Sequence, residues 1–203
     1  MENTALSKST GGTPADLHKR KLPIKEIDGQ LFRISQASRA VSGVIYYGKN
    51  QTERFDDPSG KYGVCYLGED PYAAFIEVFG QAREILLDLR FVHARALATL
   101  RLSGKVHLVD ITAHGAAWIG AAGEVAAGEH GLSQKWSLQL YLHPENVDGI
   151  YYRCRHDNSR MSIALFDKQP GLLTVERFDT WADSSMQPLL GQLLDHYRFS
   201  LKI

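Results

Sequence analysis

Short runs in which apolar and polar residues alternate recur along this chain and predict β-strands. The clearest run is QLFRIS, residues 30–35, which would place Phe32 and Ile34 on one face of a strand and Arg33 and Ser35 on the other. Further strands are predicted over residues 64–68, 105–112, 148–155 and 162–167.

Helical patterns are fewer, and the best defined one begins at Asp70. An aspartate suits the N-cap and Pro71 suits the first helical position, so a helix is predicted from there to about Gly80. Other segments predicted to be helical, wholly or in part, are 83–102 (together with a strand), 133–143 and a C-terminal extension at 184–200.

Two segments leave alternatives open. Residues 41–49 fit either a strand or an ordered loop, and the small residues of 114–131 fit either a helix or a loop. Turn-forming residues over 53–63 indicate a loop. Several short strands with few helices and no regular βαβ alternation predict an α+β fold rather than a doubly wound sheet.

The polar N-terminus suggests where the ordered domain begins. Residues 1–22 are rich in Ser, Thr, Gly and Lys, which predicts a mobile arm, and an arm that binds a partner is the alternative. We therefore expect a single domain over 23–203, a size that one domain accommodates.

Charge and hydropathy exclude several function classes. The 23 basic and 23 acidic residues balance, so the chain as a whole is not attracted to nucleic acid or anionic membrane, and any basic site must be local. No apolar run of about 18 residues predicts a membrane span. Without a signal-peptide core at the N-terminus, we expect a cytoplasmic protein.

The cysteines and histidines do not have the spacing of a metal site. Cys65 and Cys154 form neither a CxxC pair nor a zinc motif, and they fit a reducing compartment. The eight histidines lack ligand spacing, so no metal is expected. GxGxxG and Walker motifs are also missing from the sequence.

Several polar residues are candidates for chemistry. On its helix Glu77 shares a face with Ala73 and Ala74, so it lies either on the exposed face or in a cleft. Planar guanidinium groups bind phosphate or carboxylate in a bidentate manner, but spacing alone does not say whether the arginines converge; they are Arg33, Arg54, Arg153 and Arg155. Tyr66 either packs in the core or stacks on a planar ligand.

A cysteine nucleophile is a further alternative. Cys154 and His156 lie two apart, a spacing that on a strand places both side chains on one face. No third orienting group or oxyanion donor is evident beside them, and nucleophilic catalysis needs both.

Three segments together resemble the RES-domain family, which is named after an Arg, a Glu and a Ser. They are LFRIS, ERFDDPSGKYGVCYLGEDPYAAFIEVFG and DGIYYRCRHDNSRMSIALFD, spanning about residues 31–167. The resemblance implies a small mixed or antiparallel sheet similar to that of ADP-ribosyltransferase toxins, with NAD⁺ as substrate. Such proteins degrade NAD⁺ by hydrolysis or phosphorolysis, or transfer ADP-ribose to a protein, and many are toxins of bacterial toxin–antitoxin systems.

The resemblance also implies roles for individual residues. Arg33 and Glu77 match the family's catalytic positions, and the NAD⁺ contacts would come from Arg33, Arg54, Tyr66 and Cys154. Glu77 would face the ribose, Arg33 and Arg54 the phosphate or ribose oxygens, and Tyr66 the nicotinamide. Cys154 stands where the family has serine, and a thiol is the weaker hydrogen-bond donor. Ser159 and Ser133 are alternative sources of a hydroxyl.

The implied partner is a cognate antitoxin with a helix-turn-helix domain, together with a target protein if ADP-ribose is transferred. Neither nucleic acid nor membrane is an expected direct partner. Two other functions remain open: a non-enzymatic RES-like binding module whose Cys154 marks lost activity, and a cysteine-dependent hydrolase.

Overall fold

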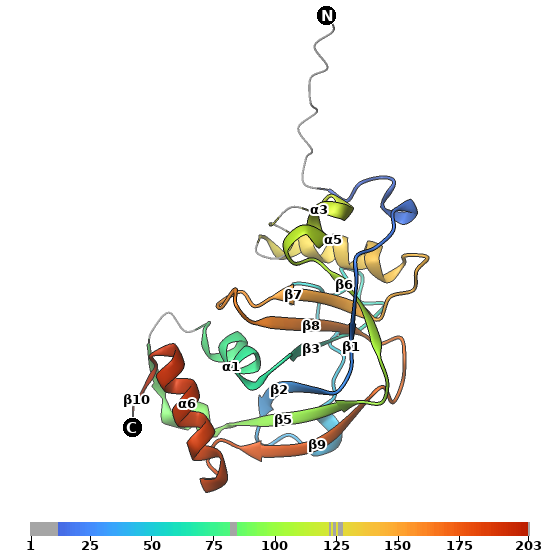
Figure 1. Ribbon diagram of the computed structural model, residues 1–203. Helices are drawn as coiled ribbons and strands as arrows, with labels where there is room; N and C mark the ends of the chain where they lie inside the picture. The colour runs from blue at the N-terminus through green and yellow to red at the C-terminus, as the bar shows by residue number, and fades with distance from the viewer. Residues whose placement is uncertain (1–11, 82–84, 122, 124, 126–127, 203) are drawn as a thin grey trace, which may run out of the picture.

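A curved eight-stranded sheet forms the centre of the computed structural model, which describes residues 12–81, 85–121, 123, 125 and 128–202 (Figure 1). The strand order is β1-β6-β7-β8-β3-β2-β5-β9, and each pairing is antiparallel except that between β6 and β7. The strands are β1 (Ile24–Ile27), β2 (Gln30–Gln36), β3 (Val64–Gly68), β5 (Arg95–Leu102), β6 (Val106–Asp110), β7 (Gly149–Arg153), β8 (Met161–Phe166) and β9 (Leu173–Thr180). The predicted α+β fold is confirmed.

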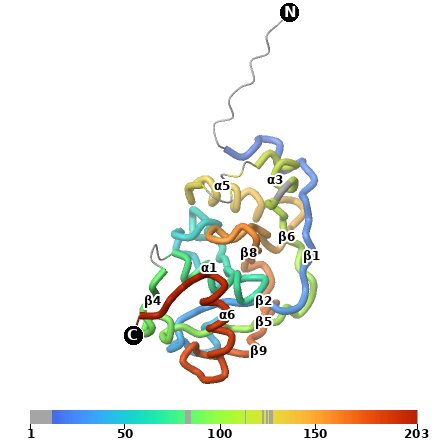
Figure 2. Tube along the Cα trace, turned by 60° about the vertical axis from the view of Figure 1, so that its left-hand side comes forward, coloured from blue at the N-terminus to red at the C-terminus, as the bar shows by residue number. Residues whose placement is uncertain are grey.

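The helices cover two separate parts of this sheet. They are α1 (Pro71–Phe79), α2 (Leu89–His93), α3 (Ala113–Ile119), α5 (His130–Tyr141) and α6 (Gln187–Tyr197), with 3₁₀ turns at Leu17–Lys19, Val41–Gly43 and Ser184–Met186. Figure 2 shows α3 and α5 together beyond β8, whereas α6 lies beside α1 at the other end of the molecule. Near α6, β10 (Ser200–Lys202) pairs in parallel with β4 (Leu86–Asp88).

Apolar side chains form three main clusters around the sheet. The first joins α5 to β7 and β8 and includes Trp136, Leu140 and Phe166. The second fills the opposite face of these strands, and the third joins α1 and α6 to β5 through residues such as Phe75 and Trp181. Burial of this apolar surface is the main favourable contribution to folding. Strands β2 and β3 run between the clusters, so packing on several sides supports them.

Most of the sequence-predicted elements are confirmed, with small shifts at their ends. The predicted strands correspond to β2, β3, β6, β7 and β8, and the predicted helices to α1, α5 and α6. Residues 41–49 form an ordered loop with one 3₁₀ turn and a bridge between Gly48 and Val64. Within 83–102 the helix is α2 and the strand is β5, and 114–131 holds most of α3 and the start of α5.

The predicted mobile arm of residues 1–22 extends too far along the chain, because its last residues pack against the domain. Residues 1–11 lie outside the described part of the chain, but Leu17 and Leu22 are buried in the first apolar cluster. The backbone N–H of Leu22 also donates to Glu145 Oε1 over 2.9 Å. The packed domain therefore includes residues 17–22. Within the described residues no helix has the length and apolar character to cross a bilayer.

Candidate functional site

A cavity opens where β2 and β3 separate. Within the described residues these two strands pair at one position, Phe32 with Gly68, and then diverge. The resulting cavity has a volume of about 940 Å³ and is lined by both strands, by α1, by the loop before β3 and by the loop between β7 and β8. It brings together six residues of interest: Arg33, Arg54, Tyr66, Glu77, Arg155 and Ser162.

Helix α1 carries Glu77 into this cavity. Asp70 Oδ1 accepts the N–H of Ala73 over 2.7 Å, as expected of an N-cap, and Pro71 begins the helix. Gly68 lets the helix approach β3 closely, because an added Cβ there would lie 2.6 Å from the backbone nitrogen of Ala74. Glu77 is half-buried and lines the cavity, so the cleft alternative is the correct one.

A backbone contact holds the carboxylate of Glu77. Its Oε1 accepts the N–H of Arg155 over 2.7 Å, and Arg155 belongs to the loop between β7 and β8. A charge-assisted hydrogen bond of this kind restricts the carboxylate to one position. The orientation of Glu77 therefore depends on a segment 78 residues further along the chain.

Arg33 is anchored on the β3 side of the cavity. Its Nη1 donates to the carbonyl oxygen of Tyr46 over 2.9 Å and to Cys65 Sγ over 2.8 Å. Burial raises the pKa of the Cys65 thiol, with Arg33 acting in the opposite direction, so the sulfur accepts this hydrogen bond as a neutral group. Arg33 thus presents a positive charge to the cavity from a restrained position.

Arg54 is more deeply buried, with 8% of its surface exposed. Its Nη1 donates to the carbonyl oxygen of Gly128 over 2.7 Å and lies 3.3 Å from Ser133 Oγ. Burial lowers the pKa of Arg54 and the charge of Arg155 acts in the same direction, whereas Glu77 acts to raise it. An arginine remains charged under such conditions. Ser133 contributes to holding Arg54, and it is not part of the cavity lining.

Tyr66 and Asp56 hold the loop that carries Arg54. The Tyr66 hydroxyl donates to Asp56 Oδ1 and accepts the N–H of Phe55, each over 2.9 Å. Asp56 Oδ2 accepts the N–H groups of Thr52 and Glu53. Burial, followed by the charge of Asp56, raises the pKa of Tyr66, so the phenol stays neutral. Tyr66 lines the cavity, and its hydroxyl is engaged in the loop.

Cys154 does not occupy the position that the sequence suggests. It is fully buried, and among the described residues Ser162 of β8 lines the cavity in its place. The two side chains are in contact, with Cys154 Sγ 3.0 Å from Ser162 Oγ. Ser159 hydrogen-bonds to Asp157 instead of entering the cavity. The sequence gives no signal for Ser162, because the pairing of β7 with β8 places it there.

The same environment argues against a cysteine nucleophile. Burial raises the pKa of Cys154 to about 12, with the hydrogen bond between Cys154 and Ser162 acting in the opposite direction and the Glu77 carboxylate adding to the increase. A nucleophilic cysteine needs a lowered pKa and an accessible sulfur. At neutral pH Cys154 is a buried thiol.

The cavity contains more positive charge than the matched family positions indicate. Arg39 and Arg155 line it together with Arg33 and Arg54. Arg155 was a candidate from the sequence without an assigned role, whereas Arg39 was missed because nothing in its local pattern distinguishes it. Arg153 donates to the carbonyl oxygen of Asn158 over 2.6 Å and is not part of the lining.

Comparisons with known proteins identify a family model and a relative in sequence. Residues 30–185 match the family model described as the RES domain. The chain is 32% identical over 107 residues to "Probable toxin y4kH" of Sinorhizobium fredii (strain NBRC 101917 / NGR234), a match that covers 52% of this chain and 80% of that protein.

A solved structure has a similar fold. A chain in the crystal structure of the M. tuberculosis MbcT–MbcA toxin–antitoxin complex matches with a TM-score of 0.63 at 15% identity. The match covers 88% of this chain and 98% of that chain, so the likeness in fold extends over nearly the whole molecule.

Proposed function

The chain belongs to the RES-domain family, and from this premise we propose that it is the toxin of a bacterial toxin–antitoxin system and cleaves the nicotinamide–ribose bond of NAD⁺. One observation carries the proposal: Arg33, Arg54, Tyr66 and Glu77 come from separate parts of the chain and line one cavity. A cleft with convergent polar groups is the usual form of a ligand site. The relative named a probable toxin supports the toxin role.

The size and charge of the cavity suit a dinucleotide. A volume of about 940 Å³ lies at the upper end of the range for small-molecule and cofactor sites. Guanidinium groups pair with phosphate oxygens in a bidentate manner, and four arginines of the described part of the chain line this cavity. We assign Arg33 and Arg54 to the pyrophosphate or ribose oxygens, and the ring of Tyr66 to the nicotinamide.

Glu77 supplies the negative charge that the reaction requires. When the glycosidic C–N bond breaks, its electron pair leaves with nicotinamide, and positive charge develops on the ribose as an oxocarbenium-like cation. A carboxylate held beside that carbon stabilises the cation more than it stabilises intact NAD⁺. The hydrogen bond from Arg155 N–H keeps the carboxylate in place for this role.

The acceptor completes the reaction by adding to the ribose carbon and losing a proton. Water would give hydrolysis, phosphate would give phosphorolysis, and a protein side chain would give ADP-ribosylation. All three routes share the same cleavage step, so the residues in the cavity serve each of them equally.

A protein partner is part of the proposal. The similar chain of known structure comes from a toxin–antitoxin complex, and we propose that a cognate antitoxin, with a helix-turn-helix domain, likewise binds this chain. Co-expression with the neighbouring gene product and co-purification would test the pairing.

The direct test of the enzymatic proposal is release of nicotinamide. Purified protein is incubated with NAD⁺ in buffer alone, in buffer with inorganic phosphate, and with cell extract, and free nicotinamide is followed over time. We expect release, with the ribose product identifying the acceptor. If nicotinamide is released under none of these conditions, the enzymatic proposal is wrong and a binding role takes its place.

A further inference from the structure

The loop between β7 and β8, residues 154–160, holds Glu77 and must itself be held. Its backbone is closed by hydrogen bonds from Cys154 N to Arg160 O and from Arg160 N to Asp157 O, each over 3.0 Å. These bonds shape the loop but do not attach it to the rest of the molecule. The position of the Arg155 N–H therefore depends on contacts that the loop makes with other elements.

One attachment is to α1. Arg160 Nη1 donates to Asp70 Oδ2 over 2.7 Å, and its guanidinium lies 4.6 Å from the centre of the Tyr72 ring. At the other end of the helix Gly80 lies close to His156, because an added Cβ would be 2.9 Å from that side chain. The loop thus contacts both ends of the helix that carries Glu77.

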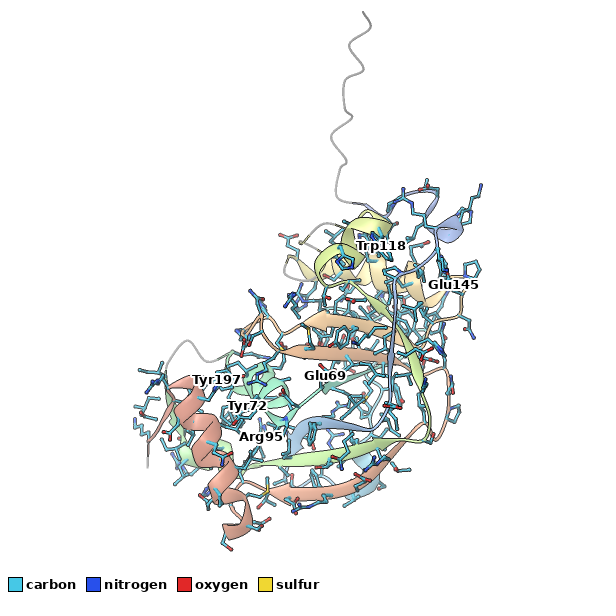
Figure 3. All side chains as sticks on the ribbon, viewed as in Figure 1. Glu69, Tyr72, Arg95, Trp118, Glu145 and Tyr197 are labelled. Atoms are coloured by element: carbon cyan, nitrogen blue, oxygen red, sulfur yellow. The ribbon has the colours of Figure 1, made fainter. Side chains whose placement is uncertain are left out.

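The other attachment comes from α6. The hydroxyl of Tyr197 donates to Asp157 Oδ2 over 3.0 Å and also lies 3.3 Å from the carbonyl oxygen of Tyr72. Figure 3 labels Tyr197 and Tyr72 side by side, between α6 and α1. Tyr197 lies outside the segment that matches the RES domain, which ends at residue 185.

Asp157 is suited to receive this hydrogen bond. Burial acts to raise its pKa, but hydrogen bonds from Ser159 and Tyr197 and the charge of Arg160 together lower it. The carboxylate is therefore ionised at neutral pH, and a hydrogen bond to an ionised acceptor is stronger than one between neutral groups.

We propose that Tyr197 is a positioning residue, which, through Asp157, holds the loop of residues 154–160 so that the Arg155 N–H keeps Glu77 aligned. The expected effect of Tyr197 on kcat rests on the proposed cleavage of NAD⁺. Its expected effect on the loop rests on geometry alone. It gives the C-terminal helix a role at the site in addition to its packing against α1.

The expected kinetic effect follows from the role of Glu77. A carboxylate that stabilises the transition state more than bound NAD⁺ affects kcat, whereas the arginines that bind the substrate affect KM. Tyr197→Phe removes the hydroxyl and retains the ring, which packs on Phe75. We expect this variant to lower kcat about ten-fold and to change KM less than two-fold.

Tyr151 provides a matched control. Its hydroxyl donates to Glu69 Oε2 over 2.9 Å, so it also makes a tyrosine–carboxylate hydrogen bond of nearly the same length. Tyr151 packs in the second apolar cluster, away from the cavity lining. Tyr151→Phe therefore removes an equivalent bond without touching the loop that holds Glu77.

The experiment measures nicotinamide release and backbone hydrogen exchange in wild type, Tyr197→Phe and Tyr151→Phe, with thermal unfolding as a check on folding. We expect Tyr197→Phe alone to lower kcat and to speed exchange at Arg155 and its neighbours in the loop. Equal kcat values for the two variants, or unchanged exchange in the loop, would overturn the inference.

The two readouts keep this inference separate from the proposed function. If wild type releases no nicotinamide, the proposed function fails, and exchange alone then decides the inference. In that case faster exchange in the loop for Tyr197→Phe, but not for Tyr151→Phe, still supports Tyr197 as the residue that holds the loop. If Tyr197→Phe does not fold, Asp157→Asn is measured against the same criteria.

Discussion

The thiol of Cys154 is fully buried and contacts the hydroxyl of Ser162, and the Glu77 carboxylate contributes to raising its pKa. Its packing partners include Ala73 and Ile76 of α1. The residue therefore supports the helix that carries Glu77, and the serine that lines the cavity is Ser162. The sulfur of Cys154 therefore packs as a buried apolar group and does not act as a reactive one.

The first prediction concerns the activity of Cys154→Ser. A serine offers a better hydrogen-bond donor at nearly the same place, and no thiolate takes part in the proposed cleavage. We expect the variant to release nicotinamide at least as fast as wild type, measured as initial rates at saturating NAD⁺. A loss of ten-fold or more in a correctly folded variant would restore the cysteine-nucleophile alternative.

The second prediction concerns the pH dependence of stability. The pKa of Cys154 rises from 9.0 to about 12 on folding, so the neutral thiol is favoured in the folded state. Its contribution to stability is complete below pH 9 and is lost as the pH rises from 9 toward 12. The loss is up to about 1.4 kcal/mol per pH unit.

Comparison with Cys154→Ser isolates this contribution. Serine does not titrate in this range, so the difference in free energy of unfolding between wild type and variant should fall above pH 9. Urea unfolding at several pH values from 7 to 10.5 measures it. A difference that stays constant over this range would contradict the buried neutral thiol.

At the residue scale, the sequence predicts which face of a strand a side chain occupies, but it does not predict contacts between distant residues. Alternation in QLFRIS places Arg33 on the face opposite Phe32 and Ile34, and in the structure those two apolar residues do pack together in the third cluster. The contact of Glu77 with Arg155 is not predictable from spacing, because it spans 78 residues and depends on how α1 meets the loop between β7 and β8.

Among the elements, the divergence of β2 from β3 creates the cavity. The two strands share one paired position, and Gly68, at that position, allows α1 to pack closely enough to bring Glu77 over the gap. A side chain at this glycine would meet backbone atoms of α1, which cannot move without displacing the helix.

The third prediction tests this close approach. Gly68→Ala places a Cβ 2.6 Å from the backbone nitrogen of Ala74, and we expect it to lower the free energy of unfolding by about 1–3 kcal/mol. Gly104→Ala is the matched control, since nothing lies within 4 Å of its added Cβ, and we expect a change within about 0.5 kcal/mol. Equal values from chemical denaturation of the two variants would contradict the account.

Strand β9 shows why some elements escape prediction. An irregularity in its pairing with β5 between Thr99 and Leu100 shifts the register. As a result Val175 and Phe178, three residues apart, both pack against the second apolar cluster. The period of two that indicates a strand is lost from the sequence at that point. Strand β1 is short and lies at the other edge of the sheet, which leaves little pattern to detect.

For the whole molecule, sequence pattern predicts the fold class and the family resemblance supplies the site. Arg33, Arg54, Tyr66 and Glu77 do line one cavity, although their spacing left convergence open. Three features of the site depend on tertiary packing. Arg39 and Arg155 line the cavity, Ser162 lines it where Cys154 was expected, and α6 contacts the loop that holds Glu77. That packing is invisible to local patterns because the partners are far apart in sequence.

The central claim is that Glu77 is the carboxylate that acts on NAD⁺. In Glu77→Gln the amide oxygen still accepts the Arg155 N–H, so the side chain keeps its place while its negative charge is removed. Glu69→Gln is the control, because it removes the same charge from a residue that is bonded to Tyr151 and does not line the cavity.

The measurement is the rate of nicotinamide release from NAD⁺ by wild type and by these two variants. We predict that Glu77→Gln lowers kcat by about 100-fold or more, the size of effect found when one group that stabilises a transition state is removed, while Glu69→Gln stays within two-fold of wild type. A folded Glu77→Gln variant that releases nicotinamide as fast as Glu69→Gln would contradict the claim.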